Sequence, residues 1–131
     1  MNEVSYLMLR LVAGISFFGH GLIRLPKLNA FSQWMVGNFS KSMLPQSLVA
    51  PFSYLLPIAE FTIGILLLMG LFTQKTAIAG VVVMLLLMLG TCLIENWEAL
   101  PSQTIHALIL IMLYQFIAAN LFSLDHIIFK K

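Results

Sequence analysis

The stretch FGHGLIRLPK places a histidine, His20, between two glycines and an arginine, Arg24, one helical turn further along. Glu60 and His106 each lie inside another apolar stretch of the chain. A charged side chain at the centre of a membrane span costs at least about 2.5–3.5 kcal/mol, so such residues rarely occur there without a function or a partner. Imidazole and guanidinium groups donate hydrogen bonds, and a carboxyl group exchanges protons. Together these residue types suit two roles, a polar pocket that binds the oxygen atoms of a ligand and a polar cluster that holds helices together.

The segments that must position these residues are strongly apolar. The chain has 131 residues, of which 60% are hydrophobic and only 9% are charged. A soluble domain of this size cannot bury so much apolar surface. Residues 76–94 and 107–124 carry no charge, and each is about as long as one bilayer crossing of roughly 20 residues. The composition therefore predicts a multi-pass membrane protein in contact with the lipid bilayer. The formal net charge of +2 is small and scattered, so nucleic acid is not an expected partner.

The apolar segments predict an all-α membrane protein, a bundle of four transmembrane helices in a single domain, residues 1–131. We expect the spans at about residues 4–23, 52–72, 75–94 and 104–123. The turn between the second and third spans is very short, so these two helices should be antiparallel neighbours. Glu3 and Arg10 interrupt the first segment, unlike a cleavable signal peptide, and we therefore expect the first span to remain in the mature protein.

The connection between the first two spans, residues 24–51, has a helical pattern of its own. Large apolar residues recur at helical spacing with polar residues between them: Phe31, Trp34, Met35, Phe39 and Met43. This pattern predicts a short amphipathic helix in the membrane interface, with Asn29 as its N-cap. A re-entrant segment is the main alternative. We expect Trp34 and Trp97 to act as interfacial anchors.

The predicted topology gathers ionisable residues at one end of the bundle. With four spans, the long connection after the first span and the connection between the last two lie on the same side of the membrane, which we call the loop end. Helical rise places His20, Glu60 and His106 within roughly two turns of that surface, whereas Arg24 and Glu95 lie at it. Polar stripes on the first, second and fourth spans should therefore face one another inside the bundle.

Arg10 and the basic residues near the membrane surfaces are less informative. Arg10 shares a helix face with His20 but lies deeper, at about the depth of Tyr114 and Gln115. Three basic residues fall on each side of the membrane: Lys75, Lys130 and Lys131 against Arg24, Lys27 and Lys41. Because this count is a tie, the positive-inside rule assigns no orientation. We expect the Lys130–Lys131 tail to contact lipid headgroups.

Two motifs resemble those of a known family. The pattern R–x3–G–x5–HG, formed by Arg10, Gly14, His20 and Gly21, resembles the start of the DoxX-like family of small four-helix membrane proteins. The stretch LPIAEFTIGILLLMGLFTQKTAIAG resembles that family's second motif, a glutamate followed by a glycine, a leucine run and a GLFT-like turn. The resemblance implies a protein of the inner (cytoplasmic) membrane with both termini in the cytoplasm. It also implies an association with redox enzymes, such as thiosulfate:quinone oxidoreductase and proteins of oxidative-stress handling.

The first functional hypothesis is a redox-associated subunit that binds a quinone or a similar lipophilic molecule. The predicted ligand-binding residues are His20, Arg24, Glu60, His106, Arg10, Glu95 and Trp34. A quinone head needs hydrogen-bond donors for its carbonyls and a group that passes protons, roles that suit His20, His106 and Arg24 as donors and Glu60 as proton carrier. Trp34 would cover the mouth of the pocket. Oxidoreductase activity is implied by the resemblance alone.

The alternative is a non-catalytic membrane anchor or assembly partner for a redox or stress-response enzyme, with a polar cluster that is mainly structural. A partner redox subunit and a homo-oligomer both remain open. A haem between His20 and His106 is a weaker hypothesis, because two histidines are the minimum and there is no CxxCH motif. No metal site is expected, since the eight methionines do not cluster at ligand spacing and Cys92 is alone. Small-solute transport is disfavoured by the lack of an inverted repeat.

Overall fold

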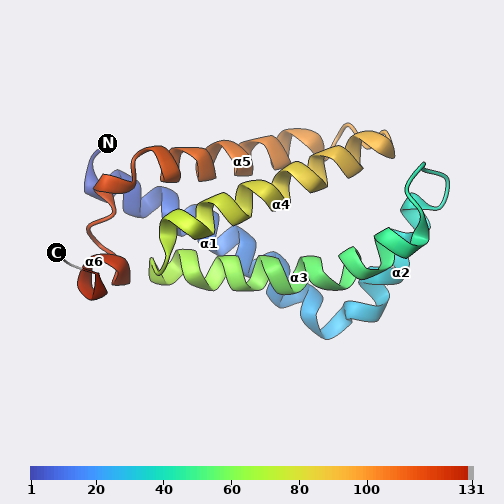
Figure 1. Cartoon of the computed structure of the whole chain (residues 1–131), viewed down its shortest axis with the longest axis horizontal. Coiled ribbons are helices and arrows are strands. Elements are labelled where there is room, and N and C mark those ends of the chain that lie inside the picture. Colours follow the sequence, from blue (N-terminus) through green and yellow to red (C-terminus); the bar gives the residue numbers. More distant parts are fainter. Residues whose placement is uncertain (130–131) are drawn as a thin grey trace.

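The computed structural model describes residues 1–129, and the predicted basic tail, Lys130 and Lys131, lies outside them. Within this range the regular elements are all helical, as predicted. In chain order they are α1 (Glu3–Arg24), the 3₁₀ helix η1 (Leu25–Lys27), α2 (Leu28–Phe39), α3 (Gln46–Met69), α4 (Thr73–Leu93), α5 (Leu100–Gln115), the 3₁₀ helix η2 (Ile117–Ala119) and α6 (Leu124–Ile128). Figure 1 shows the start of α1 and the short helix α6 at one end of the bundle, which we call the terminal end, and α2 with the α4–α5 connection at the other.

Three helical stretches of residues 1–129 are long and apolar enough to cross a membrane: Glu3–Phe39, Gln46–Met69 and Thr73–Leu93. The helix α5 has 16 residues and is therefore about 24 Å long, somewhat shorter than the hydrocarbon core of a bilayer. It begins at Leu100 and ends at Gln115, instead of covering the expected residues 104–123. The early start follows from Pro101, which is favoured in the first turn of a helix. The early end follows from Asn120, whose side chain bonds to α1 and α4 and draws the chain out of the helix.

The connection between α1 and α3 contains the predicted short helix, but its start differs from the prediction. The helix α2 begins at Leu28 and follows η1 almost without a break, so Asn29 lies inside the helix. The side chain of Asn29 accepts a hydrogen bond of 2.8 Å from the hydroxyl of Tyr54 on α3 instead of capping α2. The face of α2 toward α3 buries Ser32 and Met35, while Trp34 on the other side is exposed. The position of α2 in the membrane interface stays a prediction.

The helices form two antiparallel pairs, α1 with α3 and α4 with α5 (Figure 1). Glycines permit the close approach within the first pair. A Cβ atom at Gly21 would lie 2.5 Å from the backbone nitrogen of Phe61, and a Cβ at Gly64 would collide with the backbone of Phe18. Gly21 and Gly64 therefore lie where α1 and α3 are in close contact, and little open space remains beside them.

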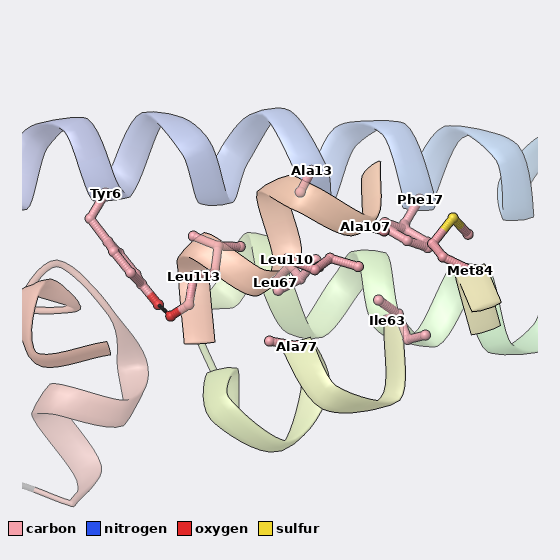
Figure 2. Close-up of a cluster of buried hydrophobic side chains, with 10 residues drawn as sticks. All are labelled: Tyr6, Ala13, Phe17, Ile63, Leu67, Ala77, Met84, Ala107, Leu110 and Leu113. Atoms are coloured by element: carbon pink, nitrogen blue, oxygen red, sulfur yellow. Dashed lines mark hydrogen bonds between the residues drawn. The ribbon is translucent and has the colours of Figure 1, made fainter. Parts of the chain in front are cut away.

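A core of buried apolar side chains joins the two pairs (Figure 2). Its members come from all four long helices: Tyr6, Ala13, Phe17, Ile63, Leu67, Ala77, Met84, Ala107, Leu110 and Leu113. Figure 2 shows the hydroxyl of Tyr6 reaching the backbone of α5, where it donates a hydrogen bond of 2.7 Å to the carbonyl oxygen of Leu113. The core ends near Phe17 and Met84, and beyond this level the two helix pairs and α2 border a half-open cavity.

Candidate functional site

A cavity of about 460 Å³ lies at the loop end, between the α1–α3 pair and the α4–α5 pair. Its size falls within the range of sites for small organic ligands. Most of its lining is apolar and includes aromatic residues from α1, α2 and α3: Phe17, Phe31, Trp34, Phe39 and Phe52. Its polar lining residues include Ser16, His20, Arg24, Glu60, Gln103 and His106. The cavity can therefore hold a molecule with a large apolar part and a small polar head.

An ion pair stands at one side of the cavity. Nη1 of Arg24, in the last turn of α1, donates to both carboxylate oxygens of Glu60 on α3, at 3.3 Å to Oε1 and 3.0 Å to Oε2. The Arg24 guanidinium also lies 4.5 Å from the centre of the Phe31 ring on α2, in a cation–π contact. Because Glu60 is buried and its charge is compensated by Arg24, this side of the cavity has no net charge.

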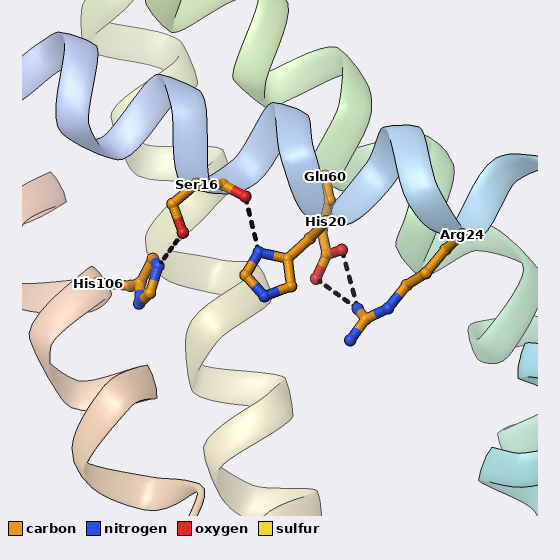
Figure 3. A network of polar contacts seen from close by, with 5 residues as sticks. All are labelled: Ser16, His20, Arg24, Glu60 and His106. Atoms are coloured by element: carbon orange, nitrogen blue, oxygen red, sulfur yellow. Dashed lines mark hydrogen bonds and ion pairs between the residues drawn. The ribbon is translucent and has the colours of Figure 1, made fainter.

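Two histidines stand beside this pair, and Ser16 connects them (Figure 3). Nδ1 of His20 lies 2.7 Å from the backbone carbonyl oxygen of Ser16, one turn earlier on α1. The Ser16 hydroxyl is hydrogen-bonded to Nε2 of His106, and Nδ1 of His106 lies 2.7 Å from the carbonyl oxygen of Ser102 on α5. Figure 3 shows the ring of His20 between His106 and the Arg24–Glu60 pair.

The structure brings five of the seven predicted site residues to the cavity wall: His20, Arg24, Glu60, His106 and Trp34. They come from α1, α2, α3 and α5, so four helices contribute to one site. Trp34 is 60% exposed and lies on α2, where it borders the cavity. The other two predicted residues, Arg10 and Glu95, do not line the cavity. Their positions in the structure explain why.

Arg10 belongs to a separate polar cluster at the terminal end. Its Nη1 donates to Oδ1 of Asn120 at 2.6 Å, and its Nη2 donates to the carbonyl oxygen of Phe122 at 2.8 Å. Side chains on a helix lean toward its N-terminus, which carries the Arg10 guanidinium away from the cavity. For the same reason its partners lie beyond Tyr114 and Gln115, the residues at its own depth. Arg10 therefore fastens the chain after α5 to α1.

Glu95 lies in the α4–α5 connection, where the chain leaves α4 with a positive φ of 56°. The Glu95 side chain is exposed and does not line the cavity, whereas its neighbour Asn96 does. The end of the apolar segment predicted that Glu95 lies at the membrane surface, but it did not predict the left-handed conformation at this residue.

Ser16 is the functional candidate that the sequence reasoning missed. It lies four residues before His20, on the same face of α1, so the spacing of the two residues was a usable signal. However, the hydroxyl of a serine in an apolar helix commonly bonds to a backbone carbonyl of its own helix, so the residue type alone does not indicate a functional role. Only the packing of α5 against α1 shows that its hydroxyl meets His106.

The ring of His106 is held by hydrogen bonds at both nitrogens, to the Ser16 hydroxyl and to the Ser102 carbonyl oxygen. A haem between His20 and His106 would require His106 to give up one of these bonds. Within residues 1–129 no group of three or more His, Cys, Asp or Glu residues could hold a metal ion.

The fold and the cavity define the class of the chain: an all-helical integral membrane protein with a largely apolar cavity at one end of the bundle. The DoxX family model matches residues 5–92, which is well over half of the chain, and the chain therefore belongs to the DoxX family. The matched range contains both motifs noted in the sequence and four of the five predicted residues at the cavity. No curated protein and no solved structure matches the chain.

Proposed function

We propose that this DoxX family member is a four-span protein of the inner membrane whose loop-end cavity binds a quinone or a similar lipophilic molecule, in association with a redox enzyme. The observation that supports this proposal best is the cavity itself, in which apolar walls surround a short row of polar groups, His20, Arg24 and Glu60. A quinone has the matching shape, an apolar tail and a ring with oxygen atoms.

A fourth span is supported by the surface of α5. Several large apolar side chains of this helix are exposed in the isolated chain: Ile105, Leu108, Ile111 and Met112. Such a surface is unfavourable in water and normal in contact with acyl chains. A helix somewhat shorter than the bilayer core is accommodated by local thinning of the bilayer at modest cost. In this topology both termini lie on one side, and we propose the cytoplasmic side because of the family resemblance.

The proposed roles follow from position. Arg24 can donate to a ligand oxygen through the nitrogens that Glu60 does not use, since only Nη1 takes part in the ion pair. His20 faces the space between His106 and the ion pair, which makes it the closest ring to the ligand head (Figure 3). Glu60 would carry protons only when a ligand loosens its bond to Arg24. Arg10 and Glu95 take no part in this proposal.

One observation favours the alternative, a non-catalytic anchor or assembly partner. Both carboxylate oxygens of Glu60 and both ring nitrogens of His106 are hydrogen-bonded within the protein, by Arg24, Ser16 and Ser102, without any ligand. A self-satisfied cluster can hold helices together without binding anything. In that case the exposed face of α2 would be the docking surface for the partner enzyme.

The test is the chemical identification of what co-purifies with the protein. The chain is purified in a mild detergent, and extracted lipids are analysed by mass spectrometry for the wild type, Glu60→Gln and His20→Phe. The expected result is a quinone or its reduced form in about stoichiometric amount in the wild type and at least a several-fold loss of their sum in both variants. His126→Phe is the matched control, because this histidine lies on α6 at the terminal end. An equal sum in all four samples, or neither form in the wild type, contradicts the proposal.

A further inference from the structure

The hydrogen-bonding character of the cavity wall can be worked out atom by atom, because Nδ1 of each histidine faces a backbone carbonyl oxygen. A carbonyl oxygen accepts hydrogen bonds and never donates them. Each histidine nitrogen that faces a carbonyl must therefore carry the proton. The tautomer of each ring follows from this rule, and with it the kind of ligand that the wall can bind.

His20 presents an acceptor to the cavity. Its Nδ1 faces the Ser16 carbonyl oxygen at 2.7 Å and so carries the hydrogen. In the neutral ring, Nε2 then has a lone pair and no hydrogen. Within residues 1–129 this Nε2 has no hydrogen-bond partner, and Figure 3 shows the ring projecting from α1 into the space between His106 and the Arg24–Glu60 pair. A ligand that bonds to this atom must bring a hydrogen.

The Ser16 hydroxyl, which belongs to the same polar cluster as His20, also offers a ligand only acceptor lone pairs. Nδ1 of His106 faces the Ser102 carbonyl oxygen, so its Nε2 accepts the hydrogen of the Ser16 hydroxyl. The single hydrogen of that hydroxyl is thus used within the protein, and only lone pairs of Ser16 Oγ remain for a ligand. The carboxylate of Glu60 likewise has lone pairs only. Arg24 is the nearby donor, through the nitrogens other than Nη1.

From this arrangement we infer that the cavity prefers the reduced, dihydroxy form of a quinone, the quinol, over the oxidised form. The inference rests on the proposed function and concerns the same site. A quinol hydroxyl donates to Nε2 of His20 and can accept from Arg24. A quinone carbonyl only accepts, so it can use Arg24 but places its lone pairs against that of His20, leaving both unsatisfied. One hydrogen bond of ordinary strength corresponds to about tenfold in affinity.

Preference for one redox form has a measurable consequence for the couple. A site that binds the quinol about tenfold more tightly than the quinone raises the midpoint potential of the bound two-electron couple by about 30 mV. The bound ligand is then harder to oxidise than the same molecule free in the bilayer. The cavity would hold reduced carrier and release oxidised carrier.

The experiment compares three ligands on the full chain in lipid nanodiscs under anaerobic conditions, with affinities measured by titration calorimetry. The ligands are a decyl-substituted benzoquinone, its quinol, and the dimethyl ether of that quinol, which has the same shape but no hydroxyl hydrogen. In the wild type we expect the quinol to bind about tenfold more tightly than either of the others. The variant His20→Phe keeps a ring but lacks the acceptor, so the preference should disappear. His126→Phe at the terminal end should retain it.

The outcomes separate the two proposals. Equal affinity for the three ligands, or tighter binding of the quinone, overturns the inference and leaves the quinone site in place. Binding of none of them overturns both. A preference that persists in His20→Phe overturns the role of His20. If that variant does not fold, the wild-type comparison of quinol with its dimethyl ether still decides whether a donated hydrogen is required.

Discussion

Nη1 of Arg24 lies 3.0 Å from Oε2 of Glu60 and so joins the end of α1 to the middle of α3 beside the cavity. The two side chains differ in their environment, because that of Arg24 is 30% exposed and that of Glu60 only 6%. The guanidinium can reach water or headgroups if its partner is removed, whereas the carboxylate cannot. Leaving Glu60 without Arg24 should therefore lower the free energy of unfolding more than leaving Arg24 without Glu60.

Arg24→Gln should destabilise the fold more than Glu60→Gln does. The first variant leaves a buried carboxylate without a counter-charge, which typically costs about 3 kcal/mol or more, while the second leaves a cation that is already partly exposed. Thermal unfolding in detergent can be followed by chemical modification of Cys92, the single, half-buried cysteine. The double variant should recover part of the loss. If the two single variants unfold at the same temperature, the asymmetry is absent.

Gly21→Ala should weaken the packing of α1 on α3. The added Cβ would lie 2.5 Å from the backbone nitrogen of Phe61, which must move with its whole helix, and overpacking of this kind typically costs about 1–3 kcal/mol. Gly19→Ala is the matched control, since a Cβ there meets nothing within 4 Å. We expect Gly19→Ala to be neutral or slightly stabilising, because alanine favours the helix. A comparable loss in both variants would mean that helix approach is not the cause.

Asn120→Ala should loosen the terminal end without affecting the cavity. Asn120 accepts from Arg10 at 2.6 Å and donates to Thr73 at 3.0 Å, so its loss leaves a buried guanidinium short of a partner. Hydrogen bonds to charged groups are worth about 1.5–3 kcal/mol, and a decrease of that size is expected in unfolding experiments. Tyr114→Phe, in contrast, should have little effect, although Tyr114 lies at the depth of Arg10. A stability loss confined to Tyr114→Phe would reverse this assignment.

Much of the fold is readable in the sequence because the bilayer imposes simple rules. Backbone polar groups must be satisfied within each apolar segment, so long apolar runs become helices. Membership of the DoxX family is likewise visible in residues such as Arg10, His20 and Glu60, and the family match confirms it. Helix ends are harder to predict, as α5 shows, because Pro101 and Asn120 shift them through local preference and through contacts with other helices.

The candidate site, like the fold, could be predicted from the sequence only in part. Periodicity along each apolar segment determined that His20, Arg24, Glu60 and His106 share one end of the bundle, because depth follows from the rise per residue. Only the tertiary structure decided which of them pair, since the rotation of each helix about its axis and the lean of each side chain depend on its neighbours. That is why Arg10 meets Asn120 and not the cavity, and why Ser16 becomes the connection between two histidines.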